Sequence, residues 1–224
     1  MKIENFVFDM GNVITEFRPR DYVAPFAPDE KTRDALVATI FASREWQLLD
    51  RGEITYPEAV ALWQSREAGL SREIRSVADN WYKYKTLIVP VNQLAMALKD
   101  RGYGIYLLSN ASDKFPLYKS LIPALRVLDG WVLSYECHIL KPDPAIFRLL
   151  FDRYALSPES CFYIDDMEAN VEAGRAFGME GIVFPTDGNY VRAVGGIIRA
   201  INGLGVNISI EELSSYHCER TLAL

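Results

Sequence analysis

The chain has 224 residues, of which 50% are hydrophobic, and its formal net charge is −6. This length and composition allow one large domain, or one domain with a smaller insertion, around a sizeable core. A mildly acidic surface attracts a nucleic-acid backbone weakly, so no nucleic-acid partner is expected. The sequence has no membrane-spanning stretch and no signal-like N-terminus, and its three cysteines lack metal-ligand spacing. We therefore expect a cytoplasmic protein with reduced thiols and no membrane association.

Apolar runs that alternate with helical patterns dominate most of the chain. Buried strands are predicted at residues 3–8, 103–108 and 161–164, and weaker ones at 131–133 and 181–184. Between and after the strands lie patterns typical of helices, at 91–101, 144–154, 167–177 and 189–202. This alternation predicts an α/β fold in which a doubly wound, Rossmann-like parallel sheet is covered by helices on both faces. The tail beyond Gly188 suggests no function.

The segment of residues 17–86 interrupts this alternation. It lacks convincing strands and is typical of several helices, one of which begins with the capping-box spacing of Thr55 and Glu58. We therefore predict a helical cap at 17–86, inserted into a core formed by residues 1–16 and 87–224. Most aromatic residues of the cap are expected to pack in its interior rather than contact ligand: Trp46, Trp63, Trp81, Tyr82 and Tyr84.

Polar residues stand where the three best strands end. Asp9 follows the first strand, and Ser109 and Asn110 follow the second. Because ligands bind beyond the carboxyl ends of parallel strands, these side chains are expected to converge on one site. Asp9 suits a nucleophile or a metal ligand, and a hydroxyl with an amide suits phosphate oxygens. Lys141, just before a helix start at Pro144, adds a cation that could neutralise a phosphoryl group.

Two adjacent carboxylates, Asp165 and Asp166, follow the third strand. Neighbouring carboxylates repel each other and resist desolvation, so a positive charge should hold them. Mg²⁺ fits because it prefers hard oxygen ligands and keeps waters and substrate phosphate in its shell. The alternative is an acidic helix N-terminus that favours the helix dipole, which explains the pair alone but not the other polar residues.

These residues resemble the four ordered motifs of the haloacid-dehalogenase-like superfamily. The motifs are Asp9-Met10-Gly11-Asn12-Val13, Ser109-Asn110, Lys141-Pro142 and Ile164-Asp165-Asp166-Met167-Glu168-Ala169-Asn170. The insertion resembles the helical cap of the beta-phosphoglucomutase-like and epoxide-hydrolase-like branches. The opening motif, the paired aspartate and an Arg51-Gly52-Glu53-Ile54 stretch are similar to those of small bacterial phosphatases acting on alpha-D-glucose 1-phosphate.

The resemblance implies a magnesium-dependent phosphatase with an aspartyl-phosphate intermediate. Asp9 would be the nucleophile, and Mg²⁺ would be held by the Asp9 carboxylate, the Gly11 carbonyl and Asp166. Asp165 would support the metal shell directly or through water. The substrate would be a small phosphorylated metabolite of the sugar-phosphate class, and the resemblance implies no particular oligomeric state.

The same resemblance implies how the phosphoryl group is held. Ser109 and Asn110 would bind its oxygens, and Lys141 would offset the charge on Asp9 and on the transferring group. Water would then release phosphate from the enzyme.

One position departs from the usual pattern. Most phosphatases of the superfamily carry an aspartate as general acid/base two residues after the nucleophile, where this chain has Gly11. General acid–base catalysis typically accelerates a reaction about 10²–10⁴-fold, so esters with poor leaving groups should react slowly unless another group donates the proton.

Two alternatives to a phosphatase are consistent with Gly11. The first is a metal-independent 2-haloacid dehalogenase, which would leave Asp165 and Asp166 unexplained. The second is a catalytically weak regulatory protein that binds Mg²⁺ and phosphate.

Overall fold

The computed structural model describes residues 2–221 and has a five-stranded parallel sheet at its centre. The strand order is β5-β4-β1-β6-β7, so the first strand lies in the middle with β4 and β6 beside it. The predicted α/β fold with a parallel sheet is confirmed. The strands are β1 (Asn5–Phe8), β4 (Gly104–Ser109), β5 (Gly130–Leu133), β6 (Cys161–Asp165) and β7 (Glu180–Val183).

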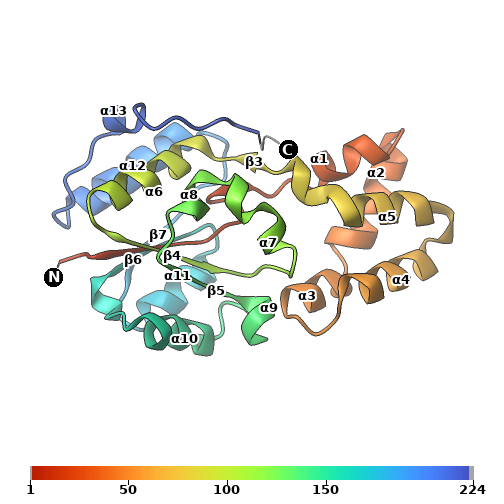
Figure 1. Ribbon diagram of the computed structural model, residues 1–224, viewed down its shortest axis with the longest axis horizontal. Coiled ribbons are helices and arrows are strands. Elements are labelled where there is room, and N and C mark those ends of the chain that lie inside the picture. The colour runs from red at the N-terminus through yellow and green to blue at the C-terminus, as the bar shows by residue number, and fades with distance from the viewer. Residues whose placement is uncertain (1, 222–224) are drawn as a thin grey trace.

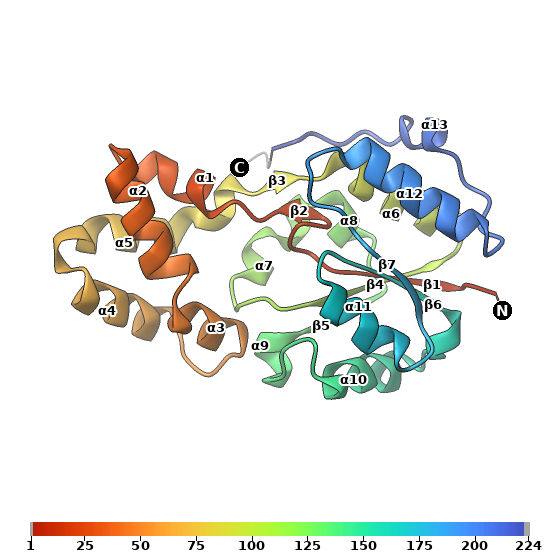
Figure 2. The same cartoon turned by 180° about the vertical axis from the view of Figure 1, so that it is seen from behind.

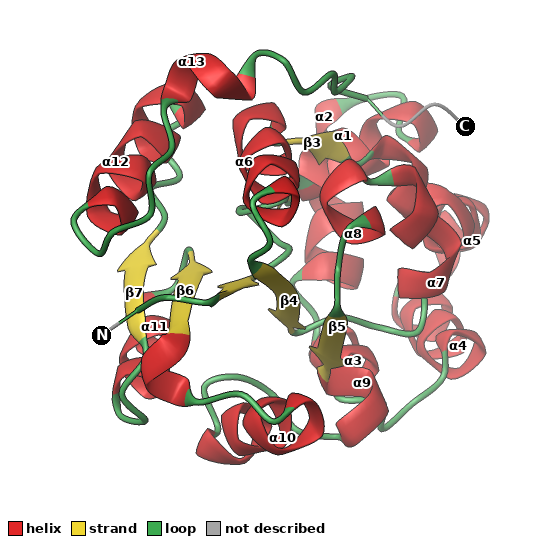
Figure 3. Cartoon of the chain, turned by 60° about the vertical axis from the view of Figure 1, so that its left-hand side comes forward, coloured by secondary structure: helices red, strands yellow, loops and turns green. Residues whose placement is uncertain are grey.

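Helices cover both faces of this sheet (Figure 3). Along β1 the side chains alternate: Phe6 and Phe8 belong to the core on one face, and Val7 belongs to the core on the other. The first face is covered by α6 (Val89–Asp100), α8 (Pro123–Arg126) and α12 (Tyr190–Asn202), and α13 (Ile210–Leu213) packs on α6 and α12. The second face is covered by α10 (Pro144–Tyr154) and α11 (Glu168–Arg175). Burial on both faces explains why the central strands β1, β4 and β6 are largely apolar, whereas the edge strand β7 is partly exposed.

A helical insertion follows the first strand and lies at one end of the sheet (Figures 1 and 2). It has its own hydrophobic core, in which Trp63 is fully buried. The capping box predicted for Thr55 and Glu58 is present at the start of α4. Its elements are α1 (Pro19–Val23), η1 (Ala24–Phe26), α2 (Glu30–Leu36), η2 (Val37–Phe41), α3 (Arg44–Asp50), α4 (Tyr56–Arg66), η3 (Ala68–Leu70), α5 (Ser71–Asn80) and η4 (Trp81–Tyr84).

Two very short strands connect the insertion to the sheet-bearing part. β2 (Thr15–Glu16) pairs antiparallel with β3 (Thr86–Leu87), so the outgoing and returning chains run side by side. Sequence patterns did not predict this pair because two residues are too few to show a period. The remaining short elements are α7 (Phe115–Tyr118), η5 (Lys119–Leu121), α9 (Ser134–Cys137) and η6 (Pro158–Ser160).

The C-terminal tail packs back onto the molecule. Val206 and Ile208 are buried with the core that covers the first sheet face, and the Leu87 amide donates to the Arg220 carbonyl at 2.8 Å. The described part of the tail therefore has a packing role.

Among the described helices, none combines the length and the hydropathy needed to cross a membrane.

Candidate active site

The sheet brings the predicted polar residues to one edge. Phe8 pairs with Leu107 of β4 and Ile164 of β6, and the Asp9 amide donates to the Ile164 carbonyl at 2.9 Å. Asp9 therefore emerges between the ends of the two neighbouring strands, as expected for parallel strands in register. One carboxylate oxygen from each of Asp9, Asp165 and Asp166 lies within 4.8 Å of the others.

Lys141 sits at the centre of this group. Its ammonium donates to Asp9 Oδ1 and Asp165 Oδ2, both at 2.7 Å, and to the Leu108 carbonyl at 2.9 Å. It also lies 3.2 Å from the hydroxyl of Tyr163, and its side chain is only 2% exposed. Burial alone would lower the pKa of Lys141, but the charges of Asp9 and Asp165 outweigh it and raise that pKa. A permanently charged, desolvated ammonium is thus fixed between two carboxylates.

Asp9 is buried but keeps one oxygen free. Burial raises the pKa of Asp9 to about 6; Lys141 acts in the opposite direction, and Asp165 adds to the rise. Lys141 occupies Oδ1, whereas Oδ2 accepts no hydrogen bond from residues 2–221. A carboxylate held at one oxygen and open at the other is suited to attack an electrophile or to bind a metal.

Asp165 has a more constrained environment. Both of its oxygens accept hydrogen bonds, from Lys141, Tyr163, the Met167 amide and the Asn170 side chain. Burial acts to raise the pKa of Asp165, but the Lys141 charge and these hydrogen bonds hold it below its usual range. The Asp165 carboxylate is therefore ionised and held in place. Its main contact is with Lys141, which it positions, and it does not line the cavity.

Asp166 has the least compensated charge of the three. Its described hydrogen-bond partner is the Asn12 amide, at 2.9 Å, and burial raises the pKa of Asp166 above its usual range. Asn12 adopts a left-handed backbone (φ 56°), which asparagine tolerates better than most residues. This excess of carboxylate over cation suits a hard divalent ion such as Mg²⁺, with Asp9 and Asp166 as the accessible ligands.

The second strand end supplies Ser109 and Asn110 in different roles. The Asn110 side chain accepts from the Lys141 amide at 2.8 Å and donates to the Lys141 carbonyl at 3.3 Å. It thereby fixes the loop that carries the lysine. The Ser109 hydroxyl is buried and donates to the Asn110 carbonyl at 3.4 Å. Direct binding of phosphate oxygens by these two side chains stays a prediction.

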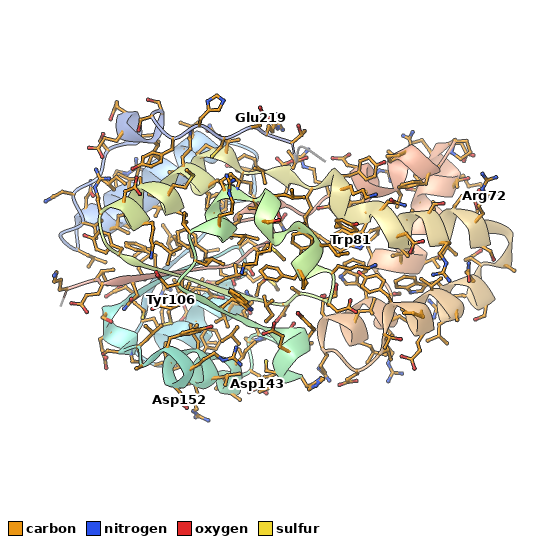
Figure 4. All side chains as sticks on the ribbon, in the orientation of Figure 1. Arg72, Trp81, Tyr106, Asp143, Asp152 and Glu219 are labelled. Atoms are coloured by element: carbon orange, nitrogen blue, oxygen red, sulfur yellow. The ribbon has the colours of Figure 1, made fainter. Side chains whose placement is uncertain are left out.

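A cavity of about 220 Å³ opens in front of these groups, between the sheet edge and the helical insertion. Asp9, Gly11, Asn110, Lys141 and Asp166 line it, so five of the seven predicted site residues share one space. The other two, Ser109 and Asp165, are buried behind its wall and do not line it. The insertion contributes one part of the remaining wall: Phe17, Trp46, Asp50, Trp81 and Lys85. The sheet-bearing part contributes the other: Met10, Asn12, Ala111, Ser112, Tyr118 and Met167. Figure 4 shows Trp81 where the insertion meets the sheet-bearing part.

The aromatic residues of the insertion are mainly core, as predicted, with two qualifications. Trp46 and Trp81 are buried but also line the cavity, and their ring centroids lie 5.2 Å apart. Tyr84 is exposed rather than buried. The sequence-based prediction treated packing in the core and contact with a ligand as alternatives. Trp46 and Trp81 do both, because each packs in the core of the insertion and also lines the cavity.

Two charged cavity residues were missed by sequence reasoning. Lys85 is buried, lies about 5 Å from the ring centroids of Trp81 and Tyr118, and has its pKa lowered to about 8 by burial, against the pull of Asp50 and Asp9. Asp50 ends α3 and has its pKa raised to about 7, mainly by burial. Neither belongs to a motif, and neither strand ends nor periodicity could have indicated them.

The fold and site are those of an α/β protein whose candidate nucleophile, Asp9, is an aspartate paired with the buried Lys141. The chain belongs to the haloacid dehalogenase-like hydrolase family, whose model matches residues 3–178. The sequence-based family resemblance is therefore confirmed.

Similar sequences include proteins with different activities. The chain is 25% identical over 150 residues to bifunctional epoxide hydrolase 2 of Rattus norvegicus, a match spanning 60% of this chain and only 27% of that protein. It is 23% identical over 180 residues to a sesquiterpene phosphatase of Aspergillus oryzae, covering 79% of this chain and 87% of the relative. It is also 25% identical over 147 residues to (S)-2-haloacid dehalogenase 4A of Burkholderia cepacia, covering 64% and 60% respectively.

Solved structures confirm the fold. An enzyme of the same family from Bacteroides thetaiotaomicron, in complex with magnesium and inorganic phosphate, has a TM-score of 0.65 to this chain at 19% identity. The match covers 84% of this chain and 96% of that one. At this identity the likeness supports the shared fold alone.

Proposed function

We propose that the protein is a Mg²⁺-dependent phosphatase that hydrolyses a small phosphorylated metabolite, with a sugar phosphate as the preferred class. The observation that carries the proposal is the charge balance at the sheet edge. Among the described residues, Lys141 is the one cation that forms an ion pair with any of the three carboxylates of Asp9, Asp165 and Asp166. The excess negative charge favours binding of a further cation, which a phosphatase needs and a dehalogenase does not.

The residues divide the work as follows. Asp9 would attack phosphorus with a carboxylate oxygen and carry the phosphoryl group until water displaces it. Lys141 would hold Asp9 in position and offset negative charge on the transferring group. The Gly11 carbonyl and Asp166 would complete a Mg²⁺ site with Asp9, supported by Asp165. When bound, Mg²⁺ supplies charge neutralisation for the phosphoryl oxygens.

We further propose that residues 17–86 act as the cap and that residues 1–16 and 87–224 form the catalytic core. The insertion supplies Trp46, Asp50 and Trp81 to the cavity, so it would select the leaving group. At about 220 Å³ the cavity is smaller than those of drug-sized ligands, which supports a small metabolite. Ser109 and Asn110 would bind phosphoryl oxygens in this arrangement.

An assay of metal dependence tests the proposal against its alternatives. Purified protein is incubated with p-nitrophenyl phosphate in Mg²⁺ or in excess chelator, and with 2-chloropropionate under both conditions. We expect phosphate release that requires Mg²⁺, and no halide release. Halide release in chelator would instead establish a dehalogenase, to which the Burkholderia relative points. Binding of Mg²⁺ and phosphate with neither reaction would indicate a regulatory protein.

A further inference from the structure

The cavity contains a carboxyl group that could supply the missing proton donor. We propose that Asp50, contributed by the helical insertion, is the general acid that protonates the leaving oxygen and the general base that later activates water. This inference rests on the proposed phosphatase function. Gly11 offers no side chain for this task, and Asp50 lines the same cavity as Asp9 and Gly11.

The backbone of Asp50 is fixed by the sheet-bearing part of the molecule. The Asp50 carbonyl accepts a hydrogen bond from the Ser134 hydroxyl of α9. Next to it, the Arg51 carbonyl lies 3.0 Å from Nδ1 of His138. The end of α3 is thereby tied to the segment that leads to Lys141. A catalytic side chain must be held in position, and these contacts hold it although it comes from the insertion.

Among the residues that the structure describes, none pairs with the Asp50 carboxylate, in contrast to the other acids of the site. Lys141 binds Asp9 and Asp165, and Asn12 binds Asp166. Within residues 2–221, by contrast, no group donates a hydrogen bond to the Asp50 side chain, and no cation lies within 4.0 Å of it. Asp50 is half-buried and lines the cavity, so its unpaired carboxyl group is available to a ligand bound there.

The surroundings of Asp50 support exchange of a proton near neutral pH. Burial raises the pKa of Asp50 to about 7, Lys85 acts to lower it, and Asp9 adds to the rise. The buried phenols of Tyr56 and Tyr118 also face it, and both have raised pKa values because of burial, to which Asp50 adds. Both protonation states are therefore accessible, as a group that donates and then accepts a proton requires.

Asp50 donates one proton in the first step of the reaction and takes one proton back in the second. As the Asp9 oxygen bonds to phosphorus and the ester P–O bond breaks, the leaving oxygen takes the proton of the Asp50 carboxyl group and departs as an alcohol. Water then attacks phosphorus, Asp50 accepts its proton, and the bond between Asp9 and phosphorus breaks. Inorganic phosphate is released, and Asp50 is again protonated for the next turnover.

Lys85 is the competing donor because its ammonium borders the same cavity. Its Nζ lies 3.4 Å from the Thr15 hydroxyl and about 5 Å from two aromatic ring centroids, of Trp81 and Tyr118. These contacts hold the ammonium in place. In our proposal Lys85 restrains the pKa of Asp50 and does not transfer the proton itself.

The test compares leaving groups in single-turnover experiments with Mg²⁺ and excess enzyme. Wild type, Asp50→Asn and Lys85→Met are each mixed with p-nitrophenyl phosphate, whose phenolate leaves unaided, and with an alkyl phosphate that needs protonation. We expect Asp50→Asn to lower the ratio of the alkyl rate to the aryl rate by about 10²–10⁴-fold. The fall of the alkyl rate on the alkaline side of the pKa of Asp50 should vanish in the same variant.

Two further variants separate catalysis from folding. Asp79→Asn, the same change at an exposed position of α5, should leave the ratio unchanged. Gly11→Asp in the Asp50→Asn background should restore alkyl turnover at least in part, because a Cβ at Gly11 meets nothing within 4 Å. Melting temperatures confirm that each variant is folded.

The outcomes distinguish this proposal from the proposed function. Aryl hydrolysis by wild type, with an equal loss of both rates in Asp50→Asn, would overturn the role of Asp50 while the phosphatase stands. A fall of the ratio in Lys85→Met alone would also overturn it and identify the lysine as donor. Absence of hydrolysis of either ester by folded, Mg²⁺-supplied wild type would remove both proposals.

Discussion

Replacing Lys141 by methionine tests the electrostatic design of the site most directly. The side chain is 2% exposed, and its ammonium bridges Asp9 and Asp165 at 2.7 Å each. Methionine keeps much of the length and apolar volume but removes the charge, which leaves three neighbouring carboxylates without their cation. Breaking a buried ion pair in this way typically costs about 3–5 kcal/mol, because the remaining charge is desolvated and unpaired.

The expected loss can be measured by thermal unfolding in the presence of chelator. For a chain of this length, 1 kcal/mol corresponds to about 2–4 °C, so the melting temperature should fall by roughly 6–20 °C. The matched control is Lys31→Met, an exposed lysine of α2, which should shift it little. Mg²⁺ should restore part of the lost stability because it supplies positive charge to the same carboxylates.

The pH dependence of this loss has a definite sign. Lys141 holds the pKa of Asp165 below its usual range, so in wild type this group contributes stability at neutral pH that is lost on acidification. Without the lysine, the carboxyl pKa values in the folded state rise above their unfolded values. The variant then binds more protons when folded, and its stability falls as pH rises through those values.

The difference between wild type and Lys141→Met should therefore be small near pH 5 and large near pH 8. A loss below about 1 kcal/mol that does not change with pH would refute the reasoning. It would mean that the three carboxylates are well solvated even without the lysine. The excess of negative charge would then give no argument for a divalent ion.

Two further predictions concern the nucleophile and the metal. Asp9→Asn should abolish phosphate release, because the amide cannot form the phosphoryl bond, and it should change the melting temperature little since Asp165 still pairs with Lys141. Turnover within tenfold of wild type would rule Asp9 out as nucleophile. Asp166→Ala should weaken Mg²⁺ binding, measured by calorimetry, by at least tenfold, whereas Glu168→Ala, an exposed acid two residues later, should not. Equal affinities in these two variants would contradict a metal site at Asp166.

The sequence by itself determined the sheet and the edge at which the polar residues meet. Each principal strand is a short apolar run buried on both faces, and each ends at a polar residue, so periodicity and strand ends were sufficient. Asp9, Asp165 and Asp166 were expected to converge, and one oxygen of each does lie within 4.8 Å of the others. Local signals also sufficed for the capping box of α4, which depends on only four neighbouring residues.

Only the tertiary structure decided how these groups are paired and what faces them. Asn110 binds the backbone of Lys141, 31 residues away, and Asp165 is saturated by hydrogen bonds, which no strand-end pattern could show. Asp50 and Lys85 enter the cavity because the insertion packs against the sheet edge, and that packing depends on side chains far apart in sequence. Motif spacing specifies local backbone geometry, whereas burial, pairing and the resulting pKa values depend on contacts that exist only once the chain has folded.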